Sequence, residues 1–401
     1  MEDKMAKRSL PDEVVIEILS WLPSKSLLRF RCVNKTWLKL LTKDTHFSKL
    51  HFNRSIGSNR NTSILALAKQ RFQDVTSNFY SAIDFTTCDE PIQLELPFHG
   101  DGGGYTNYAI CGICNGLILL CLKYDEEKPQ KVYLWNPHTT SDDYIVIRST
   151  PPCLIPFSDR PMTTAFSLGF NQATNQYKIF RFVSVETNFE TSELRTCASL
   201  YTLGNDSSWR ILDDNFQYHP LLLDFPVPLV NGALHWLLCK TDSTLIFEKK
   251  VLVSFDLKDE VFQEITYPSD ALISLGMGYM TVGELGGSLC LFSHKCRVDI
   301  QIWVMKEYGA VNSWTKQFKI GQPEICGSFY SLKPLCVAHS GEIIIKKNEF
   351  ELIIYNPETN SIWNLKKFGF KCYNAYAYVR SHVSPRAITG VRHDLMEAEE
   401  E

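Results

Sequence analysis

The sequence predicts a small all-α N-terminal domain of three to four helices, followed by an all-β domain that forms a β-propeller-like ring of about six blades. Apolar residues recur at helical spacing up to about residue 55, and a turn-and-strand pattern then returns with a period near fifty residues. The predicted segments are a disordered N-terminus at 1–8, the helical domain at 9–52, a linker at 53–63, the β-domain at 64–384 and an acidic disordered tail at 385–401.

The composition excludes several classes of protein. With 44% hydrophobic and 21% charged residues, the 401-residue chain has the material for a folded core. A net charge of −4 disfavours a general nucleic-acid-binding protein. The charge is divided unevenly, because residues 1–52 hold ten Lys/Arg and six Asp/Glu, a net of +4, which leaves −8 for the remainder.

The cysteines and the apolar runs predict the compartment. Thirteen cysteines, mostly single, are too sparse for a disulfide scaffold, so we expect buried thiols in a reducing environment. The N-terminus lacks the pattern of a secretory signal, and Asn115-Gly116 interrupts the apolar run at Tyr108–Leu122. We therefore expect no membrane association and a cytoplasmic and/or nuclear location.

The helical domain begins with apolar residues spaced three or four apart from Val14 to Leu22, and Pro23 ends that run. Ser24 and Asn34 are expected to cap a second and a third helix, and Asp44 a short fourth turn. A segment this short cannot bury so many large apolar side chains on itself. We expect either the β-domain or another protein to cover the apolar side chains that the helices leave exposed.

A resemblance to the F-box motif covers Leu10 to Leu41, LPDEVVIEILSWLPSKSLLRFRCVNKTWLKLL. The run has the opening Leu-Pro, an Ile-Leu pair in the first helix, a closing Leu-Pro, Leu-Leu/Arg-Phe in the second helix and a Val–Lys–Trp set opening the third. The resemblance implies docking onto the Skp adaptor of cullin-based ubiquitin ligases. The implied adaptor-binding residues are Leu10, Pro11, Ile18, Leu19, Leu22, Pro23, Leu27, Leu28, Cys32, Val33 and Trp37. The alternative is that some of them, Trp37 and Leu19 most obviously, only pack the three helices together.

The β-domain contains a repeated unit. A turn with a small residue recurs at Gly116, Gly169, Gly232, Gly287 and Gly341, at spacings of 53, 63, 55 and 54 residues. After each comes a run with a central aromatic residue: Val132–Pro137, Ser199–Leu203, Leu252–Leu257, Ile300–Met305 and Leu352–Pro357. This period favours propeller blades over an immunoglobulin-type sandwich, in which turns come every 8–12 residues or so.

A sixth blade needs strands from both ends of the domain. We expect Ser63–Ala68 or Asn78–Phe85 to pair with Cys372–Val379 and close the ring. A large sandwich of two β-sheets is the alternative architecture.

The β-domain also resembles a known family over most of residues 100–380. The strings YAICGICNGLILLC, VPLVNGALHWL and IQIWVMKEYG…SWTKQFKI are similar to the F-box-associated domain of plant F-box proteins, which includes constitutive-defence-regulator-like and S-locus-type proteins. The resemblance implies that this domain is a substrate receptor.

The residues themselves provide few signs of catalysis. Cys111 and Cys114 form a CxxC pair inside an expected buried strand, with no second pair at zinc-site spacing. The stretch HGDGGGY at His99–Tyr105 does not fit a phosphate-binding loop, and the histidines are scattered singly. We predict no catalytic residue, metal site or cofactor, and leave a propeller hydrolase or oxidase as the enzymatic alternative.

The predicted function is therefore the non-catalytic substrate-recognition subunit of an SCF-type (Skp–cullin–F-box) ubiquitin ligase, with a Skp adaptor, through it a cullin, and a protein target as partners. A lectin-like or protein-binding module that acts without a ligase is the second hypothesis. Loops carry recognition on rigid scaffolds, and the candidates here are Glu186–Ser192, Asp206–Ser208 and Lys306–Asn312. The target itself is not predicted.

Overall fold

The structure is a computed structural model. It describes residues 10–44, 46–47, 50–51, 54, 62–72, 75–84, 92–94, 96, 108–122, 131–139, 143–147, 161–188, 193–204, 208–220, 226–240, 250–271, 278–295, 298–321, 329, 332–338, 340–348, 351–365 and 372–389. The predicted N-terminal segment 1–8, the stretch at His99–Tyr105 and the acidic residues after 389 lie outside these ranges.

The N-terminal domain is a bundle of short helices, α1 (Asp12–Ser20), α2 (Ser24–Phe30) and α3 (Lys35–Lys43), as predicted. The Asn34 side chain accepts a hydrogen bond from the backbone N–H of Trp37 at 2.8 Å, so the predicted cap of α3 is confirmed. Asp44 caps the next turn through the N–H of Phe47 at 2.9 Å. The predicted Ser24 cap is wrong, because Pro23 occupies the N-cap position of α2 without a side-chain hydrogen bond.

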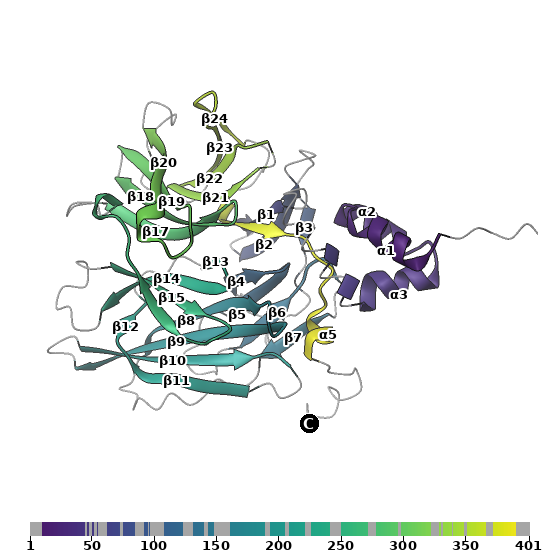
Figure 1. Ribbon diagram of the computed structural model, residues 1–401, viewed down its shortest axis with the longest axis horizontal. Coiled ribbons are helices and arrows are strands. Elements are labelled where there is room, and N and C mark those ends of the chain that lie inside the picture. The colour runs from purple at the N-terminus through teal and green to yellow at the C-terminus, as the bar shows by residue number, and fades with distance from the viewer. Residues whose placement is uncertain are drawn as a thin grey trace, which may run out of the picture.

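The described residues of the β-domain form six separate antiparallel sheets, which we call blades 1 to 6 in chain order (Figure 1). Blade 1 contains β25 (Cys372–Val379), β1 (Thr62–Phe72), β2 (Val75–Asp84) and β3 (Ile92–Leu94). Blade 2 contains β4 (Tyr108–Cys114), β5 (Leu117–Leu122), β6 (Val132–Trp135) and β7 (Tyr144–Ile147). Blade 3 contains β8 (Pro161–Asn171), β9 (Gln176–Asn188), β10 (Glu193–Thr202) and β11 (Ser208–Phe216).

The second half of the domain repeats the same unit. Blade 4 contains β12 (Tyr218–His219), β13 (Leu229–Val230), β14 (Ala233–Lys240), β15 (Lys250–Asp256) and β16 (Phe262–Ile265). Blade 5 contains β17 (Gly278–Leu285), β18 (Ser288–Lys295), β19 (Asp299–Met305) and β20 (Trp314–Gly321). Blade 6 contains β21 (Leu332–Val337), β22 (Ile343–Lys347), β23 (Glu351–Asn356) and β24 (Ser361–Asn364). A short helix, α5 (Pro385–Thr389), follows β25.

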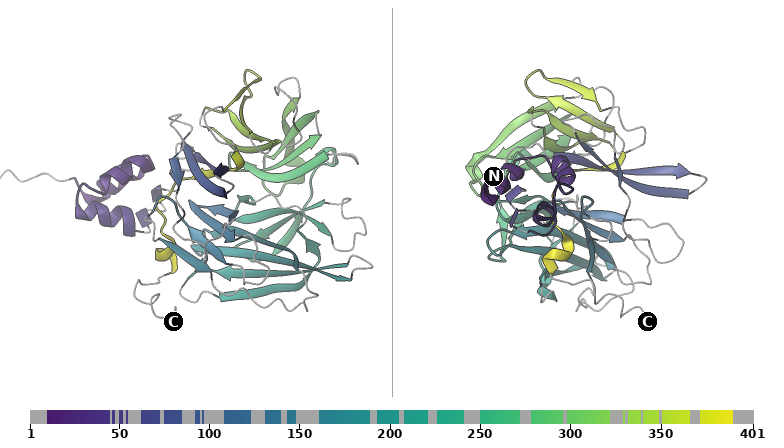
Figure 2. Two further views of the ribbon diagram at one scale, coloured as in Figure 1. Left: turned by 180° about the vertical axis from the view of Figure 1, so that it is seen from behind. Right: turned by 90° about the vertical axis from the view of Figure 1, so that its right-hand side faces the viewer.

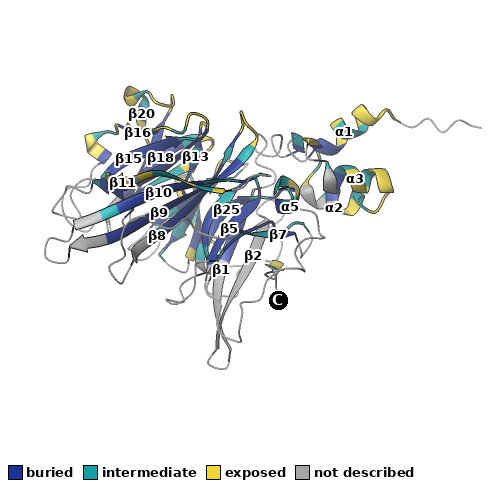
Figure 3. Ribbon diagram, turned by 90° about the horizontal axis from the view of Figure 1, so that it is seen from below, coloured by how far each residue is buried: buried dark blue, intermediate teal, exposed yellow. Residues whose placement is uncertain are grey.

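The blades follow one another as in a β-propeller, so the alternative of two large sheets is wrong. Their first strands lie side by side, β4 beside β8, β17 beside β21 and β21 beside β25. The five predicted aromatic runs are the third strands of blades 2 to 6, as the repeat requires. Most of the apolar side chains on these strands are buried, whereas the helices expose much of their surface (Figure 3).

Glycine has a different role in different blades. In the Asn115-Gly116 and Asn231-Gly232 hairpin turns both residues have positive φ, near +50° for Asn and +77° for Gly. Positive φ at both central residues is the requirement of a type I′ hairpin. The predicted turn at Gly169 is wrong, because Gly169 lies within β8 and pairs with Lys178. A Cβ there would lie 2.7 Å from Leu257 Cδ1, so the glycine is needed for packing against blade 4.

The two ends of the β-domain pair to close the ring, as predicted. β25 runs antiparallel to β1, with Ser63 opposite Tyr378 and Ile64 opposite Ala377. The chain after β25 then crosses blade 2 to reach α5 beside β7 (Figure 1). The predicted boundaries shift accordingly: β1 already starts at Thr62, and the segment predicted as a tail from 385 begins with α5.

The crossing segment is held by the turn of blade 2. The Ser381 hydroxyl donates to the carbonyl of Asn115 at 2.6 Å, and the Tyr378 hydroxyl donates to the carbonyl of Gly116 at 3.1 Å. The Asn136 side-chain amide, which is buried, donates to the carbonyls of Ser381 and Val383 at 3.2 and 2.8 Å. Backbone groups of the crossing segment thereby find partners away from water, which a buried segment requires.

We expect Gly116→Ala to destabilise the β-domain more than Gly232→Ala does. Both glycines have φ of +77°, so both substitutions carry the same conformational cost of about 1 kcal/mol. Only at Gly116 would the new Cβ meet other atoms, 2.2 Å from Ser381 Oγ and 2.9 Å from Ser381 N, whereas at Gly232 nothing lies within 4 Å. Urea denaturation of both variants measures the difference, and equal losses would show that Ser381 does not constrain the turn.

Candidate functional site

A stripe of exposed apolar side chains follows α1. We define the α1 stripe as Leu10, Val14, Ile18 and Trp21, which are 59%, 41%, 50% and 59% exposed. Val14, Ile18 and Trp21, at spacings of four and three residues, lie on one side of the helix, while Leu10 precedes its N-cap Pro11. Exposed apolar residues scattered singly are ordinary, but three on one side of a helix with a fourth just before it favour a surface that another protein covers.

The other apolar side of α1 faces the helical core. Leu19 is 1% exposed, and it packs with Leu27, Leu41 and Phe47 at the centre of the helical domain. Helix α1 is thus apolar on two sides, one buried and one exposed.

The predicted adaptor-binding set divides between these two environments. Leu10, Pro11, Ile18, Pro23, Cys32 and Val33 are exposed, and Leu22 and Trp37 are partly buried. Leu19 and Leu27 are buried between the helices, where their side chains hold the helices together, which favours the packing alternative for these two. The side chain of Leu28 lies outside the described part of the structure.

Val14 and Trp21 are the members of the α1 stripe that the predicted adaptor-binding set lacks, and Trp21 is the larger and more exposed of the two. Its indole N–H donates to Glu17 Oε1 at 3.2 Å, and the Arg54 guanidinium lies 4.6 Å from the centre of its ring. Arg54 also pairs with Glu17 at 2.8 Å, a hydrogen bond that lowers the pKa of the Glu17 carboxyl. The tryptophan is therefore held in place while remaining exposed, which suits an interface anchor. The sequence did contain a signal for this residue, because Trp21 lies three positions after Ile18 and so falls on the same side of a helix.

A cavity of about 280 Å³ lies among the first strands of the propeller. Glu284 and Lys333 are the charged residues of its lining, which is otherwise mostly apolar. Desolvation raises the pKa of the Glu284 carboxyl, which favours its neutral form. Among the described residues no group of three or more His, Cys, Asp or Glu side chains is arranged to hold a metal ion.

The CxxC pair lies in a buried strand, as predicted. Cys111 and Cys114 are both on β4 and both buried. Burial raises the pKa of the Cys114 thiol to about 12. Because the thiolate is the reactive form of cysteine, this residue is held in an unreactive state at neutral pH.

Comparison with protein-family models assigns both parts of the chain. The F-box associated beta propeller domain matches residues 68–385, and the F-box domain matches residues 8–49. The chain belongs to the F-box proteins with an F-box associated β-propeller domain. The resemblance noted in the sequence is thereby confirmed for both domains.

Curated relatives align with most of the chain. F-box protein CPR1 of Arabidopsis thaliana is 26% identical over 375 residues, 89% of this chain and 84% of that protein. F-box/kelch-repeat protein At3g23880 of the same plant is 24% identical over 396 residues, 96% of this chain and 98% of that protein.

Solved structures are similar at a lower level. An oligogalacturonate lyase in complex with manganese has a TM-score of 0.40 and 10% identity, covering 77% of this chain and 74% of its own. The Aleuria aurantia lectin has a TM-score of 0.37 and 10% identity, covering 80% and 96%. Similarity at this level carries no information about the activity of the F-box protein.

No helix in the described part of the F-box protein has the length and apolar character needed to cross a bilayer. The predicted recognition loops are only partly described. Lys306–Asn312 follows β19 and is largely exposed, with the hydroxyl of Tyr308 2.9 Å from His235 Nε2. Residues 189–192 and 205–207 lie outside the described ranges, so the other two loops remain predictions.

The F-box meets the propeller at the crossing segment after β25 (Figure 2). Arg31 Nη2 lies 3.0 Å from His382 Nδ1, and the rings of His51 and His382 are 5.8 Å apart. Because a guanidinium can only donate, His382 Nδ1 must accept, which places the imidazole proton on Nε2. The junction thus requires His382 in its neutral form.

The electrostatics of the junction support the neutral form. Burial lowers the pKa of His382 to about 3, with further lowering by Arg31, His51 and His138. Burial, aided by Arg380 and Arg31, likewise lowers the pKa of His138 to about 3. Several groups that carry or acquire positive charge therefore meet where the two domains touch, and protonating the histidines would be unfavourable there.

Acid should weaken the protein through His382. An unfolded histidine takes up a proton near pH 6.5, while folded His382 stays neutral to about pH 3, so the stability present at pH 7.5 is lost as the pH falls from about 6.5 towards 3. At pH 5.0 this loss is roughly 2 kcal/mol. We expect His382→Gln, whose amide oxygen can still accept from Arg31, to lose less stability than wild type between these pH values.

Chemical denaturation at pH 7.5 and 5.0 provides the measurement. His46→Gln is the matched control, because it removes a different, exposed histidine that takes no part in the His382 contacts. Identical pH dependence in the His382→Gln variant and wild type would contradict the assignment.

Proposed function

We propose that this F-box protein is the substrate-recognition subunit of an SCF-type ubiquitin ligase, acting in the cytoplasm or nucleus. The F-box docks a Skp-type adaptor and, through it, a cullin, while the propeller holds a protein target. The chain supplies no catalytic group in this proposal. It raises the effective concentration of target lysines near a conjugating enzyme carried by the cullin.

The α1 stripe is the observation that supports the docking step best. An exposed row of Leu10, Val14, Ile18 and Trp21 in a basic domain of about fifty residues needs a protein surface to cover it. Tryptophan held in place at the end of the row is the kind of residue that dominates binding energy in interfaces. The match to the F-box domain at residues 8–49 indicates which partner would cover it.

Affinity purification from plant cells with the proteasome blocked tests the whole proposal. We expect a Skp-type adaptor and a cullin to co-elute with the full-length chain, and a target protein to accumulate in the eluate. Mass spectrometry identifies the proteins. Recovery of the chain without adaptor and cullin would favour a binding module that acts without a ligase.

Ile18→Asp tests the assignment of the surface. A carboxylate buried without a partner in an apolar interface costs several kcal/mol, so we expect co-purification of a co-expressed Skp-type adaptor to be lost. Ile18 is half exposed, and the variant should keep its helical circular dichroism. Leu19→Asp would be a poor test, because Leu19 is in the core and its substitution would unfold the F-box.

Thr36→Asp is the matched control. Thr36 is exposed in the first turn of α3, so the substitution adds the same charge to the same domain outside the α1 stripe. We expect this variant to retain the adaptor. If Ile18→Asp retained it equally well, the α1 stripe would not be the docking surface.

A further inference from the structure

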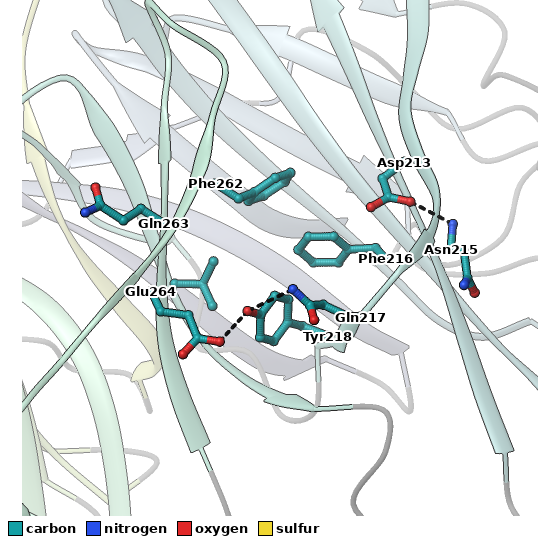
Figure 4. A pocket seen from close by; sticks show the side chains of 9 residues that line it. Asp213, Asn215, Phe216, Gln217, Tyr218, Phe262, Gln263 and Glu264 are labelled. Carbon is teal, nitrogen blue, oxygen red and sulfur yellow. Dashed lines mark hydrogen bonds between the residues drawn. The ribbon is translucent and has the colours of Figure 1, made fainter.

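A groove of about 330 Å³ opens between blades 3 and 4. It lies where the chain passes from the last strand of blade 3 to the first strand of blade 4 (Figure 4). Its lining includes Asp213, Phe216 and Tyr218 from this passage, and Phe262 and Glu264 from β16. Residues about fifty positions apart therefore share one site.

The floor of the groove is aromatic and fixed. Phe216 and Tyr218 are 3% and 4% exposed and belong to the core that joins blades 3 and 4. The Phe216 ring lies 4.6 Å from the Phe262 ring and 5.2 Å from the Tyr218 ring. Because Phe216 and Tyr218 are almost fully covered in this core, they hold the partly exposed Phe262 ring in place, and this ring offers apolar surface that needs little reordering on binding.

A bulge in β11 forms one edge of the groove. Thr196 pairs with Phe216 and Ala198 pairs with Asp213, so β11 has one more residue than β10 in this interval. Asp213 Oδ1 accepts a hydrogen bond from the N–H of Asn215 at 2.9 Å. The carboxylate is exposed, and within the described residues it makes no ion pair.

A second carboxylate occupies the other side of the aromatic floor (Figure 4). Glu264 Oε1 accepts from the Tyr218 hydroxyl at 2.5 Å and pairs with Lys240 at 3.0 Å. Burial and the nearby Glu264 raise the pKa of Tyr218 to about 12, so its hydroxyl remains a donor and fixes the carboxylate. The amide side chain of Gln263 adds another polar group beside this edge.

An arginine side chain has the chemistry that fits this combination. Its methylene stem and planar guanidinium pack on aromatic rings, and its five N–H donors suit carboxylates and amide oxygens. The net charge of the surrounding domain also favours a positively charged ligand, because residues 53–401 carry a net charge of −8. An acidic receptor surface draws basic partners towards it.

We propose that the groove between blades 3 and 4 is a target-recognition site that receives an arginine side chain from a basic segment of the target. The guanidinium contacts Asp213, and the stem packs on the partly exposed Phe262 ring. This proposal rests on the proposed receptor function and adds a substrate class to it.

Saturation-transfer-difference NMR on the full-length chain tests the groove directly. The probe is N-acetyl-arginine methylamide, and N-acetyl-citrulline methylamide is its neutral counterpart of nearly the same shape. At low salt we expect the arginine methylene signals to be at least fivefold stronger than those of citrulline, and to decline as salt is added. Asp213→Asn, which can still accept from Asn215, should reduce the arginine signal at least fivefold, and Gln263→Lys should do the same by repulsion.

Asp270→Asn is the control for net charge, because Asp270 is exposed in a short 3-10 helix (Ser269–Ala271) that follows β16 in the chain, and it does not line the groove. We expect it to bind the probe as wild type does. Equal signals from citrulline and arginine, or an unchanged signal in Asp213→Asn, would overturn the proposal. Adaptor co-purification of the same variants separates this outcome from failure of the receptor function, since the groove substitutions do not touch the α1 stripe.

Discussion

The pairing of β25 with β1, and the anchoring of the chain that follows it, is the constraint on which the rest of the structure depends. A ring of blades made in chain order is complete only when its last strand joins its first. The Ser381 and Tyr378 hydroxyls then fasten the crossing segment to the Asn115-Gly116 turn, and the buried Asn136 side chain satisfies two of its carbonyls. The C-terminal strand β25 therefore completes blade 1, and β25 and the segment after it hold blade 2 in place through these hydrogen bonds.

The same segment also sets the position of the F-box. Arg31 meets His382 only one residue after Ser381, so the contact between the domains is made by a part of the chain that the ring has already fixed. Under the proposed receptor function a fixed position matters, because a target held on a freely moving domain would gain less effective concentration near the conjugating enzyme. Within the described residues no carboxylate takes part in the His382–Arg31 hydrogen bond, so this contact depends on a neutral histidine.

The sequence predicted the domains, the blade number and the closing strands, but not which apolar residues of α1 are available to a partner. Ile18 and Leu19 are neighbours, both fit the F-box motif, and one is half exposed while the other is in the core. Amphipathic periodicity assumes a single apolar face, whereas α1 has two. The prediction of a turn at Gly169 failed for a related reason. The repeat shows only that a small residue occurs there, whereas the structure shows that it is small because Leu257 packs against it. The groove could not be predicted from the sequence. It is formed by a bulge in β11 and by residues of two blades that are about fifty positions apart in the chain.

The two proposed surfaces differ in the physical force that would hold their partners. The α1 stripe is apolar and lies in the basic part of the chain, so its binding would rest on burial of hydrocarbon and tolerate salt. The groove lies in the acidic domain and has a carboxylate at each side of its aromatic floor. Its binding would therefore depend on the charge of the ligand and weaken as the ionic strength rises. Apolar burial suits a constant subunit contact, and charge reading suits the selection of targets, because electrostatic complementarity contributes more to specificity and association rate than to affinity. The opposite charges of the two domains are thus consistent with the two proposed roles, adaptor binding by the F-box and target selection by the propeller.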